Sequence, residues 1–169
     1  VATDNGASIV THFLNAMNKE NTAGSIANFV MSDPRLMVEL IVDGHHQTFE
    51  KVRELFDAIG PRIIMVSDAM AAAGNGDGSY TIGALPVEVK DGVARLTSNQ
   101  KLAGSTLTIS QAFTNLINKC GLSVEQAVHA TSTQPAKAFG LKDRGSISVG
   151  MRADLLSYNS STGSISVVS

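Results

Sequence analysis

Three residues able to bind a metal ion or move a proton each follow a short β-prone segment: His12, His46 and Asp68. The clearest case is Asp68, because the four apolar residues 63–66 before it read as a fully buried strand and small residues follow it. Barrels of alternating strands and helices present catalytic groups in this way. Each residue alone has a plainer interpretation, since Asp68 could cap a turn or helix and His12 could be structural.

The segments that must position these residues alternate between the two secondary structures. We expect strands at residues 7–11, 36–42 and 62–67, and helices at 24–31 and 48–59. Such alternation predicts parallel strands joined by right-handed crossovers, hence an α/β fold. Because parallel strands end at the same edge of a sheet, His12, His46 and Asp68 should lie around one mouth.

The rest of the chain has a different sequence pattern. We expect one strand at 81–90, a hairpin turn at Asp91–Gly92 and a returning strand at 93–96. Helices are predicted at 110–119, from Ser123 (with a capping box to Gln126) and at 133–139, followed by short strands at 147–149, 153–158 and 165–168. We therefore assign 1–144 to one domain, with a β-hairpin excursion at about 80–97, and 145–169 to an incomplete small β domain.

Composition excludes several classes of protein. The 169 residues carry a net charge of −2, from 13 basic and 15 acidic residues that do not cluster. This argues against nucleic-acid partners and against a polybasic membrane patch. The single cysteine, Cys120, rules out an internal disulfide and suits a reducing cytoplasm. No membrane span or signal peptide is evident, so we expect a cytoplasmic protein.

Four motifs stand in a distinctive order: Thr-His-Phe-Leu-Asn-Ala-Met (11–17), Val-Asp-Gly-His-His (42–46), Val-Ser-Asp-Ala-Met-Ala-Ala-Ala-Gly (66–74) and Leu-Ala-Gly-Ser-Thr-Leu-Thr (102–108). With them the chain resembles the N-acetylglucosamine-6-phosphate deacetylase family of the amidohydrolase superfamily. Segments 134–140 and 145–155 resemble the superfamily more broadly.

The resemblance implies a metal-dependent (β/α)₈ TIM-type barrel beside a small β-sandwich. This chain would supply the last three strands with their helices, and the start of the sandwich. It also implies a divalent cofactor (zinc or iron), an amino-sugar phosphate substrate that is hydrolysed to glucosamine 6-phosphate and acetate, and a homodimer of the full-length protein.

The resemblance also implies residue roles. His12 would bind the metal, Asp68 would act as general base and acid, and His46 would contact the substrate, roles that their chemistry suits. The sugar and its N-acetyl group would be held by Asn15, Ala16, Leu102, Ala103 and Gly104. His45 occupies the variable position of its motif, and we expect Asp43 to support the mouth structurally.

The sequence departs from the family pattern twice. The family's upstream metal-binding Glu and a further metal-binding His are missing, so we expect this fragment to be inactive alone. The family's phosphate-clamping Arg segment is replaced by the shorter segment 18–22, where Lys19 is a candidate phosphate contact that lacks the bidentate geometry of Arg.

Two other functions fit the same residues. One is an amidohydrolase that cleaves a different amide or a cyclic imide. The other is a non-catalytic, metal-free module that binds a sugar phosphate and has kept the fold without the chemistry.

Overall fold

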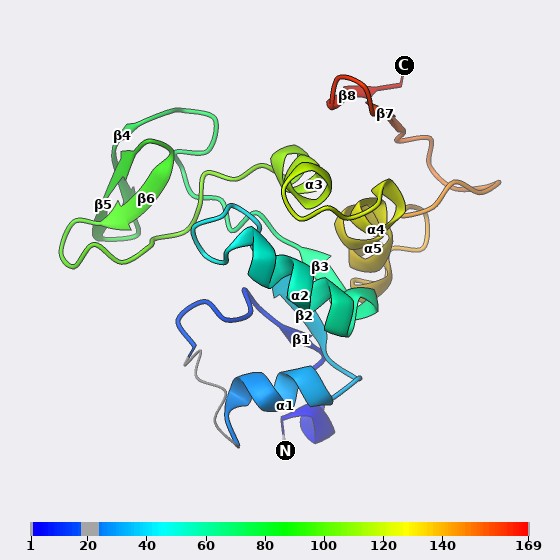
Figure 1. The fold of residues 1–169 in the computed structure, drawn as a ribbon, viewed down its shortest axis with the longest axis horizontal. Helices are drawn as coiled ribbons and strands as arrows, with labels where there is room; N and C mark the ends of the chain where they lie inside the picture. The colour runs from blue at the N-terminus through cyan, green and yellow to red at the C-terminus, as the bar shows by residue number, and fades with distance from the viewer. Residues whose placement is uncertain (1, 18–23, 169) are drawn as a thin grey trace.

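The computed structural model describes residues 2–17 and 24–168 (Figure 1). The elements before the first hairpin are η1 (Thr3–Asn5), β1 (Ile9–Val10), α1 (Ile26–Ser32), β2 (Met37–Leu40), α2 (Phe49–Ile59), η2 (Gly60–Arg62) and β3 (Ile63–Met65). Those that follow are β4 (Gly78–Ile82), β5 (Leu85–Lys90), β6 (Val93–Leu96), α3 (Ile109–Asn118), α4 (Val124–Val128), η3 (His129–Thr133), α5 (Gln134–Ala138), β7 (Leu156–Asn159) and β8 (Ser164–Val167).

The centre of the fold is a three-stranded sheet in the order β1–β2–β3. Both pairs of strands are parallel, and the register places Val38 of β2 beside Val10 on one side and Ile63 on the other. The α/β class and the parallel strands expected from the sequence are thus confirmed.

Helix α2 shows why the sequence folds this way locally. Its buried residues Val52, Leu55, Phe56 and Ile59 recur at helical spacing, and Thr48 caps its start by accepting a hydrogen bond from the Lys51 N–H at 3.2 Å. These side chains join Val38 and Leu40 of β2, which are fully buried, in one core. Each such side chain contributes about 1.5–3 kcal/mol when it is removed from water.

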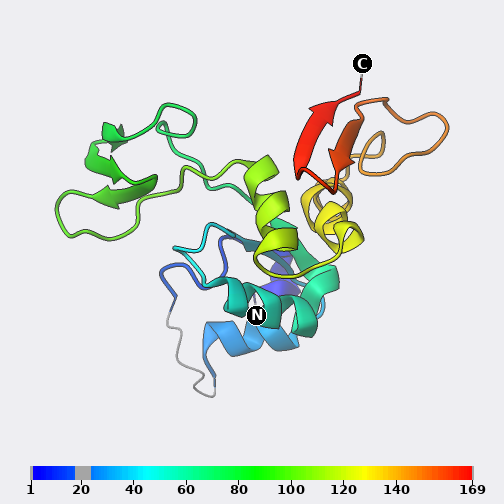
Figure 2. The ribbon, with the colours of Figure 1, turned by 45° about the horizontal axis from the view of Figure 1, so that its top comes forward.

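The prediction of one continuous strand at 81–90 is wrong, because two strands, β4 and β5, share this segment. Gly83, with φ +57°, breaks it, so that β4 and β5 pair as a hairpin and β6 adds a third antiparallel strand. The turn expected at Asp91–Gly92 is confirmed, with positive φ at both residues as a type I′ turn requires. This sheet projects from the rest of the molecule and has its own small core, formed around Val87 and Val89 (Figures 1 and 2).

The two helices expected after Ser123 are one continuous run. The capping box of Ser123 and Gln126 is confirmed, but α4 passes through the π-helix η3 directly into α5. The physical reason is Pro135, which has no N–H and whose ring would clash with a carbonyl in the preceding turn of an α-helix. A wider π-turn accommodates that ring.

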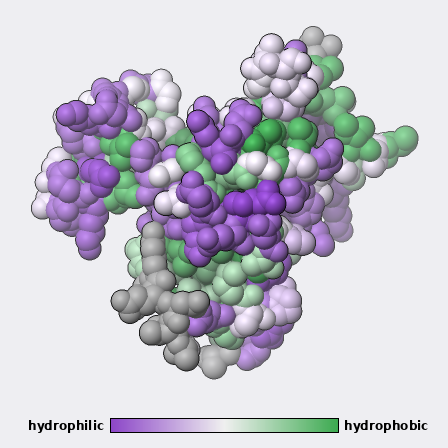
Figure 3. Space-filling model, in the orientation of Figure 1, coloured by the Kyte–Doolittle hydropathy of each residue, from purple (hydrophilic) through white to green (hydrophobic). Residues whose placement is uncertain are grey.

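The C-terminal unit lacks one of the strands expected from the sequence. Residues 147–149 form no strand, and β7 pairs only with β8. A two-stranded hairpin has little core of its own, and this one rests on α3 through Tyr158, whose ring meets Phe113 edge-to-face at 5.0 Å. The loop before it exposes Ile147 and Val149, and apolar surface is visible along this part of the molecule in Figure 3.

No helix in the described parts of the chain combines the length and the apolar character that crossing a bilayer demands.

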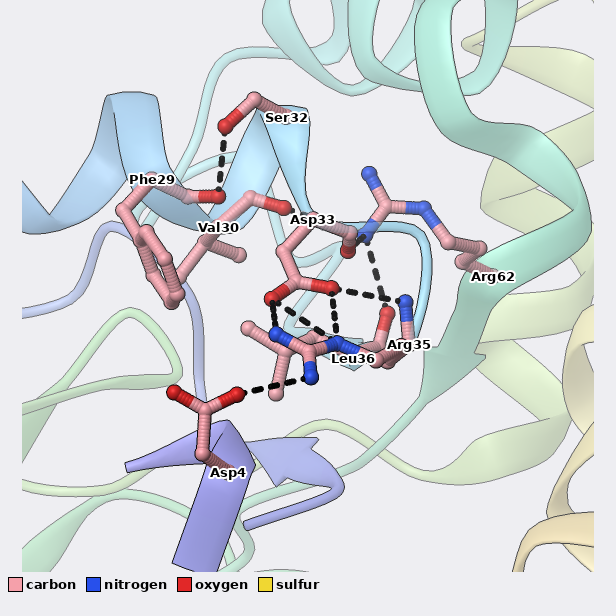
Figure 4. Close-up of polar contacts among 8 residues, drawn as sticks. All are labelled: Asp4, Phe29, Val30, Ser32, Asp33, Arg35, Leu36 and Arg62. Carbon is pink, nitrogen blue, oxygen red and sulfur yellow. Dashed lines mark hydrogen bonds and ion pairs between the residues drawn. The ribbon is translucent and has the colours of Figure 1, made fainter. Parts of the chain in front are cut away.

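Hydrogen bonds and ion pairs among charged side chains stabilise the C-terminal end of α1 (Figure 4). The Arg62 guanidinium donates hydrogen bonds at 2.7–3.0 Å to the carbonyls of Val30, Met31 and Asp33 at the end of α1, and to the carbonyl of Leu36 beyond it. The last carbonyls of the helix, which lack partners within it, are thereby satisfied. Buried Asp33 accepts three bonds from the Arg35 guanidinium at 2.6–3.2 Å. Those bonds from Arg35 hold the pKa of the Asp33 carboxyl well below its ordinary value.

In the polypeptide that carries this chain, we expect Asp33→Asn to lower the melting temperature by several degrees at pH 7, because Arg35 loses the buried carboxylate of Asp33 and keeps its exposed pair with Asp4. A carboxyl with a lowered folded-state pKa contributes stability above its ordinary pKa of 3.8, and that stability disappears as the pH falls through the folded-state pKa. Circular-dichroism melts from pH 7 to pH 3 should therefore show the difference from wild type narrowing.

The matched control is Asp57→Asn, which removes an exposed pair with Arg53 and should change the melting temperature little. A wild-type-to-variant difference for Asp33→Asn that stays constant down to pH 3 would contradict the assigned ionisation.

Candidate functional site

The parallel sheet places the ends of β1, β2 and β3 at one edge. Backbone pairing continues just past the strands, where the Phe13 N–H donates to the Glu39 carbonyl at 2.7 Å and the Val66 N–H donates to the Leu40 carbonyl at 3.0 Å. His12, His46 and Asp68 all follow this edge in the chain. The parallel pairing behind the expected shared edge is therefore present, and a common site for the three side chains stays a prediction.

The backbone at this edge is strained. In the described parts of the chain, six non-glycine residues have positive φ, and four of them lie here: His12 (+32°), Leu14 (+66°), Ala16 (+52°) and Asp68 (+49°). A left-handed conformation costs an ordinary L-residue about 1–2 kcal/mol. Such strain persists only where neighbouring structure enforces it, and it gathers at functional sites.

His12 is half-buried, and its Nδ1 is fully buried with no hydrogen-bond partner in the described structure. A buried polar atom left unpaired costs about 1–3 kcal/mol, which suits a nitrogen that binds a ligand. However, no group of three or more His, Cys, Asp or Glu residues close enough to hold a metal ion occurs among residues 2–17 and 24–168. The described residues can therefore provide His12 as one ligand but not a complete metal site.

Glu39 holds the segment around His12 from the neighbouring strand. Its carboxylate accepts a hydrogen bond from the Thr11 hydroxyl at 2.8 Å, and its carbonyl accepts the Phe13 N–H. The residues on both sides of His12 are thus fixed to β2. The only feature of the sequence that marked Glu39 was its position as a single acidic residue inside an apolar strand.

The loop after β2 is organised by Asp43. Its carboxylate accepts the backbone N–H groups of His45 and His46 at 2.9 Å and contacts the His46 Nδ1 at 2.7 Å. Burial raises the pKa of Asp43, but the hydrogen bonds from His46 and His45 outweigh it, so the pKa lies below its ordinary value. An ionised carboxylate only accepts, so the His46 Nδ1 carries the hydrogen and the ring orientation is fixed.

The position of Asp43 confirms its expected supporting role, and α3 adds a second anchor. Buried Asn115 donates from its amide to the Val42 carbonyl at 2.8 Å, and Gln111 in turn donates to the Asn115 side chain at 2.9 Å. Nothing in the sequence distinguished Asn115 from any other helix residue. Its role depends on a contact between positions 73 residues apart.

The segment 102–105 lies beside Asp68. Ser105 forms a parallel bridge with Ala69, its N–H donates to the Asp68 carbonyl at 2.8 Å, and its own carbonyl accepts the Met70 N–H at 2.9 Å. A Cβ added to Gly104, whose φ is +64°, would stand 3.1 Å from the Asp68 carbonyl oxygen. Only a glycine suits this approach.

The other expected binding residues are placed as follows. Asn15 is half-buried and its N–H donates to the His12 carbonyl at 2.9 Å, while Ala16 is exposed. Leu102 is half-buried and forms a bridge with Arg95, and Ala103 is buried with its N–H on the Ala94 carbonyl. Lys19 lies outside the described residues.

Two cavities differ in their relation to this edge of the sheet. A largely apolar cavity of about 330 Å³ lies between α3 and the β7–β8 hairpin, and none of the expected site residues lines it. A more polar one of about 410 Å³ is lined by Asp43, His45 and the Asp91–Gly92 turn, so it adjoins the loop that carries His46.

We expect Gly104→Ala to lower the melting temperature of the polypeptide more than Gly140→Ala does. Both glycines have a φ near +65°, but a Cβ at Gly140 would meet nothing within 4 Å. The backbone penalty of about 1–2 kcal/mol is shared, and only Gly104→Ala adds crowding against Asp68 and Met70. Equal melting temperatures in parallel thermal melts would show that the close approach to Asp68 does not constrain residue 104.

Comparison with known proteins gives a consistent result. A family model described as "Amidohydrolase family" matches residues 1–165. The chain is 34% identical over 161 residues to an N-acetylgalactosamine-6-phosphate deacetylase of Escherichia coli O157:H7, covering 94% of this chain and 42% of the relative. It is 33% identical over 157 residues to an N-acetylglucosamine-6-phosphate deacetylase of Vibrio furnissii, covering 92% and 39%.

Solved structures of deacetylases are also similar to this chain. A mutant N-acetyl-D-glucosamine-6-phosphate deacetylase from Mycobacterium smegmatis, in complex with N-acetyl-D-glucosamine-6-phosphate, superposes with a TM-score of 0.90 at 36% identity, covering 99% of this chain and 45% of that one. The N-acetylglucosamine-6-phosphate deacetylase from Thermotoga maritima gives 0.88 at 35% identity, covering 99% and 46%. The chain thus spans less than half the length of these relatives.

Proposed function

Because this chain belongs to the amidohydrolase family, we propose that it forms part of an enzyme that hydrolyses the N-acetyl group of N-acetylglucosamine 6-phosphate. The products are glucosamine 6-phosphate and acetate. The observation that carries the proposal is the parallel-strand edge followed by His12, His46 and Asp68. It is supported by the names of the relatives, which act on N-acetylated amino-sugar phosphates.

The same proposal includes the architecture. Strands β1, β2 and β3 would be the last three of a (β/α)₈ barrel within residues 1–144, and residues 145–169 would begin a small β-sandwich domain. The similarity of nearly the whole chain to two solved deacetylases supports a shared overall architecture.

In this mechanism a bound divalent ion, zinc or iron, would lower the pKa of a water toward 7, with His12 among its ligands. Asp68 would take a proton from the attacking water as the oxygen of the water bonds to the acetyl carbonyl carbon. It then delivers the proton to the sugar nitrogen as the carbon–nitrogen bond breaks. His46, as the imidazolium with a hydrogen on each ring nitrogen, would donate from Nε2 to the carbonyl oxygen, where negative charge develops, while its Nδ1 hydrogen stays on Asp43.

Substrate positioning falls to the remaining expected residues: Asn15, Ala16, Leu102, Ala103 and Gly104 for the sugar and its N-acetyl group, and Lys19 for the phosphate. Lys19 would act as a point charge rather than as a bidentate fork. The homodimer and the cytoplasmic location expected from the sequence are part of this proposal.

We expect Asp68→Asn, in the full polypeptide that carries this chain, to reduce acetate release from N-acetylglucosamine 6-phosphate by about 10²–10⁴-fold, the usual contribution of a general acid–base group. Acetate is measured by a coupled assay. The matched control is Asp91→Asn, which changes an exposed aspartate of nearly the same φ (+52° against +49°) in the hairpin turn. Unchanged turnover in Asp68→Asn would remove Asp68 from the mechanism.

The same assay separates the rival functions. The similarity to an N-acetylgalactosamine-6-phosphate deacetylase makes the 4-epimer the first competing substrate, and a higher kcat/KM for it would reassign the sugar. Hydrolysis of another amide or a cyclic imide without acetate release would indicate a different amidohydrolase. Tight binding of the sugar phosphate without any turnover would indicate a non-catalytic module.

The 169-residue chain by itself, supplied with zinc or iron, is expected to show no acetate release. The reason is that the described residues offer His12 without the other members of a ligand group. Measurable turnover by the purified chain, abolished by Asp68→Asn and by chelation, would contradict this expectation.

A further inference from the structure

We propose that Ser105 is a positioning residue that sets the direction of the Asp68 carboxylate. The inference rests on the proposed function, in which Asp68 moves the proton. Ser105 does not act on the substrate in this account; it acts through the backbone on both sides of Asp68.

The first support is the pattern of backbone hydrogen bonds. Ser105 is 3% exposed, and its N–H and carbonyl bond to the Asp68 carbonyl and the Met70 N–H, respectively. In the described structure, the last backbone hydrogen bond between the β3 segment and β2 is the one that the Val66 N–H donates to the Leu40 carbonyl. Beyond that point, Ser105 bonds to the backbone of Ser67, Asp68 and Met70, so it replaces β2 as the neighbour of this segment where the strand ends.

The second support is the Ser105 hydroxyl. It donates a short hydrogen bond to the Ser67 carbonyl and accepts the Leu107 N–H at 3.0 Å. Its one proton is therefore committed within the protein. Through its backbone and hydroxyl hydrogen bonds, Ser105 holds Asp68 and the nearby residues Ser67 and Met70. The hydroxyl also links this segment to Leu107, which belongs to the main core.

The third support is the strain at Asp68. Its φ of +49° is one that a free chain would relax, so a neighbouring segment must enforce it. Gly104, directly before Ser105, allows the two segments to approach within van der Waals distance. Because the direction of a side chain follows from its backbone angles, loss of the Ser105 hydrogen bonds would turn the Asp68 carboxylate away from the position in which it transfers the proton. A misplacement of about 1 Å can cost about 100-fold in rate.

The test is Ser105→Ala in the full polypeptide, with kcat and KM measured separately for N-acetylglucosamine 6-phosphate and expressed per folded enzyme. We expect kcat to fall at least tenfold while KM stays within twofold, since no substrate contact is removed. Ser105→Thr, which keeps the hydroxyl, should recover most of the turnover. The control is Ser123→Ala, which removes a hydroxyl hydrogen bond from the cap of α4 and should keep the wild-type kcat.

A double-mutant cycle distinguishes positioning from general stability. If Ser105 acts through Asp68, then Ser105→Ala should cause no further loss of kcat in the Asp68→Asn background. Additive losses, a kcat of Ser105→Ala within twofold of wild type, or a loss matched by Ser123→Ala would each overturn the inference while leaving the role of Asp68 intact. A wild-type enzyme that releases no acetate would instead refute the proposed function, and the inference with it.

Discussion

The parallel pairing of β1, β2 and β3 is the constraint on which the rest of the structure depends. Successive strands point the same way only because helices return the chain to the opposite end of the sheet each time. The register is set by Val38, Leu40 and Ile63, which are fully buried, and a slip of one residue would turn them toward the other face. The positions of His12, His46 and Asp68 follow from this pairing.

The edge is held by neighbouring segments rather than by the residues that occupy it. His12 and Asp68 both have left-handed backbones, and each is flanked by hydrogen bonds from an adjacent segment: from Glu39 for His12, and from Ser105 for Asp68. A typical hydrogen bond contributes about 0.5–1.5 kcal/mol net, so two or three of them offset the strain of one such residue. The strain after β1 and after β3 is therefore offset locally by these hydrogen bonds.

The projecting sheet of β4, β5 and β6 is connected to this edge. The chain leaves the edge after Asp68, forms the three strands and returns through residues 102–105, which pair with the segment that it left. Met70 packs on the small core of that sheet, and Ala103 belongs to it. Residues 102–105 thus support both the sheet of β4, β5 and β6 and the segment that carries Asp68, although the sheet itself projects away from the main core (Figure 1).

The sequence by itself determined the alternation of strands and helices, the amphipathic face of α2, the Ser123 cap and the Asp91–Gly92 turn, because periodicity and capping are local properties of the chain. It also singled out His12, His46, Asp68 and Asp43. Only the tertiary structure decided the parts played by Glu39, Asn115 and Ser105. Their hydrogen bonds join positions 28, 73 and 38 residues apart, and a contact between distant positions leaves no periodic trace in a single sequence.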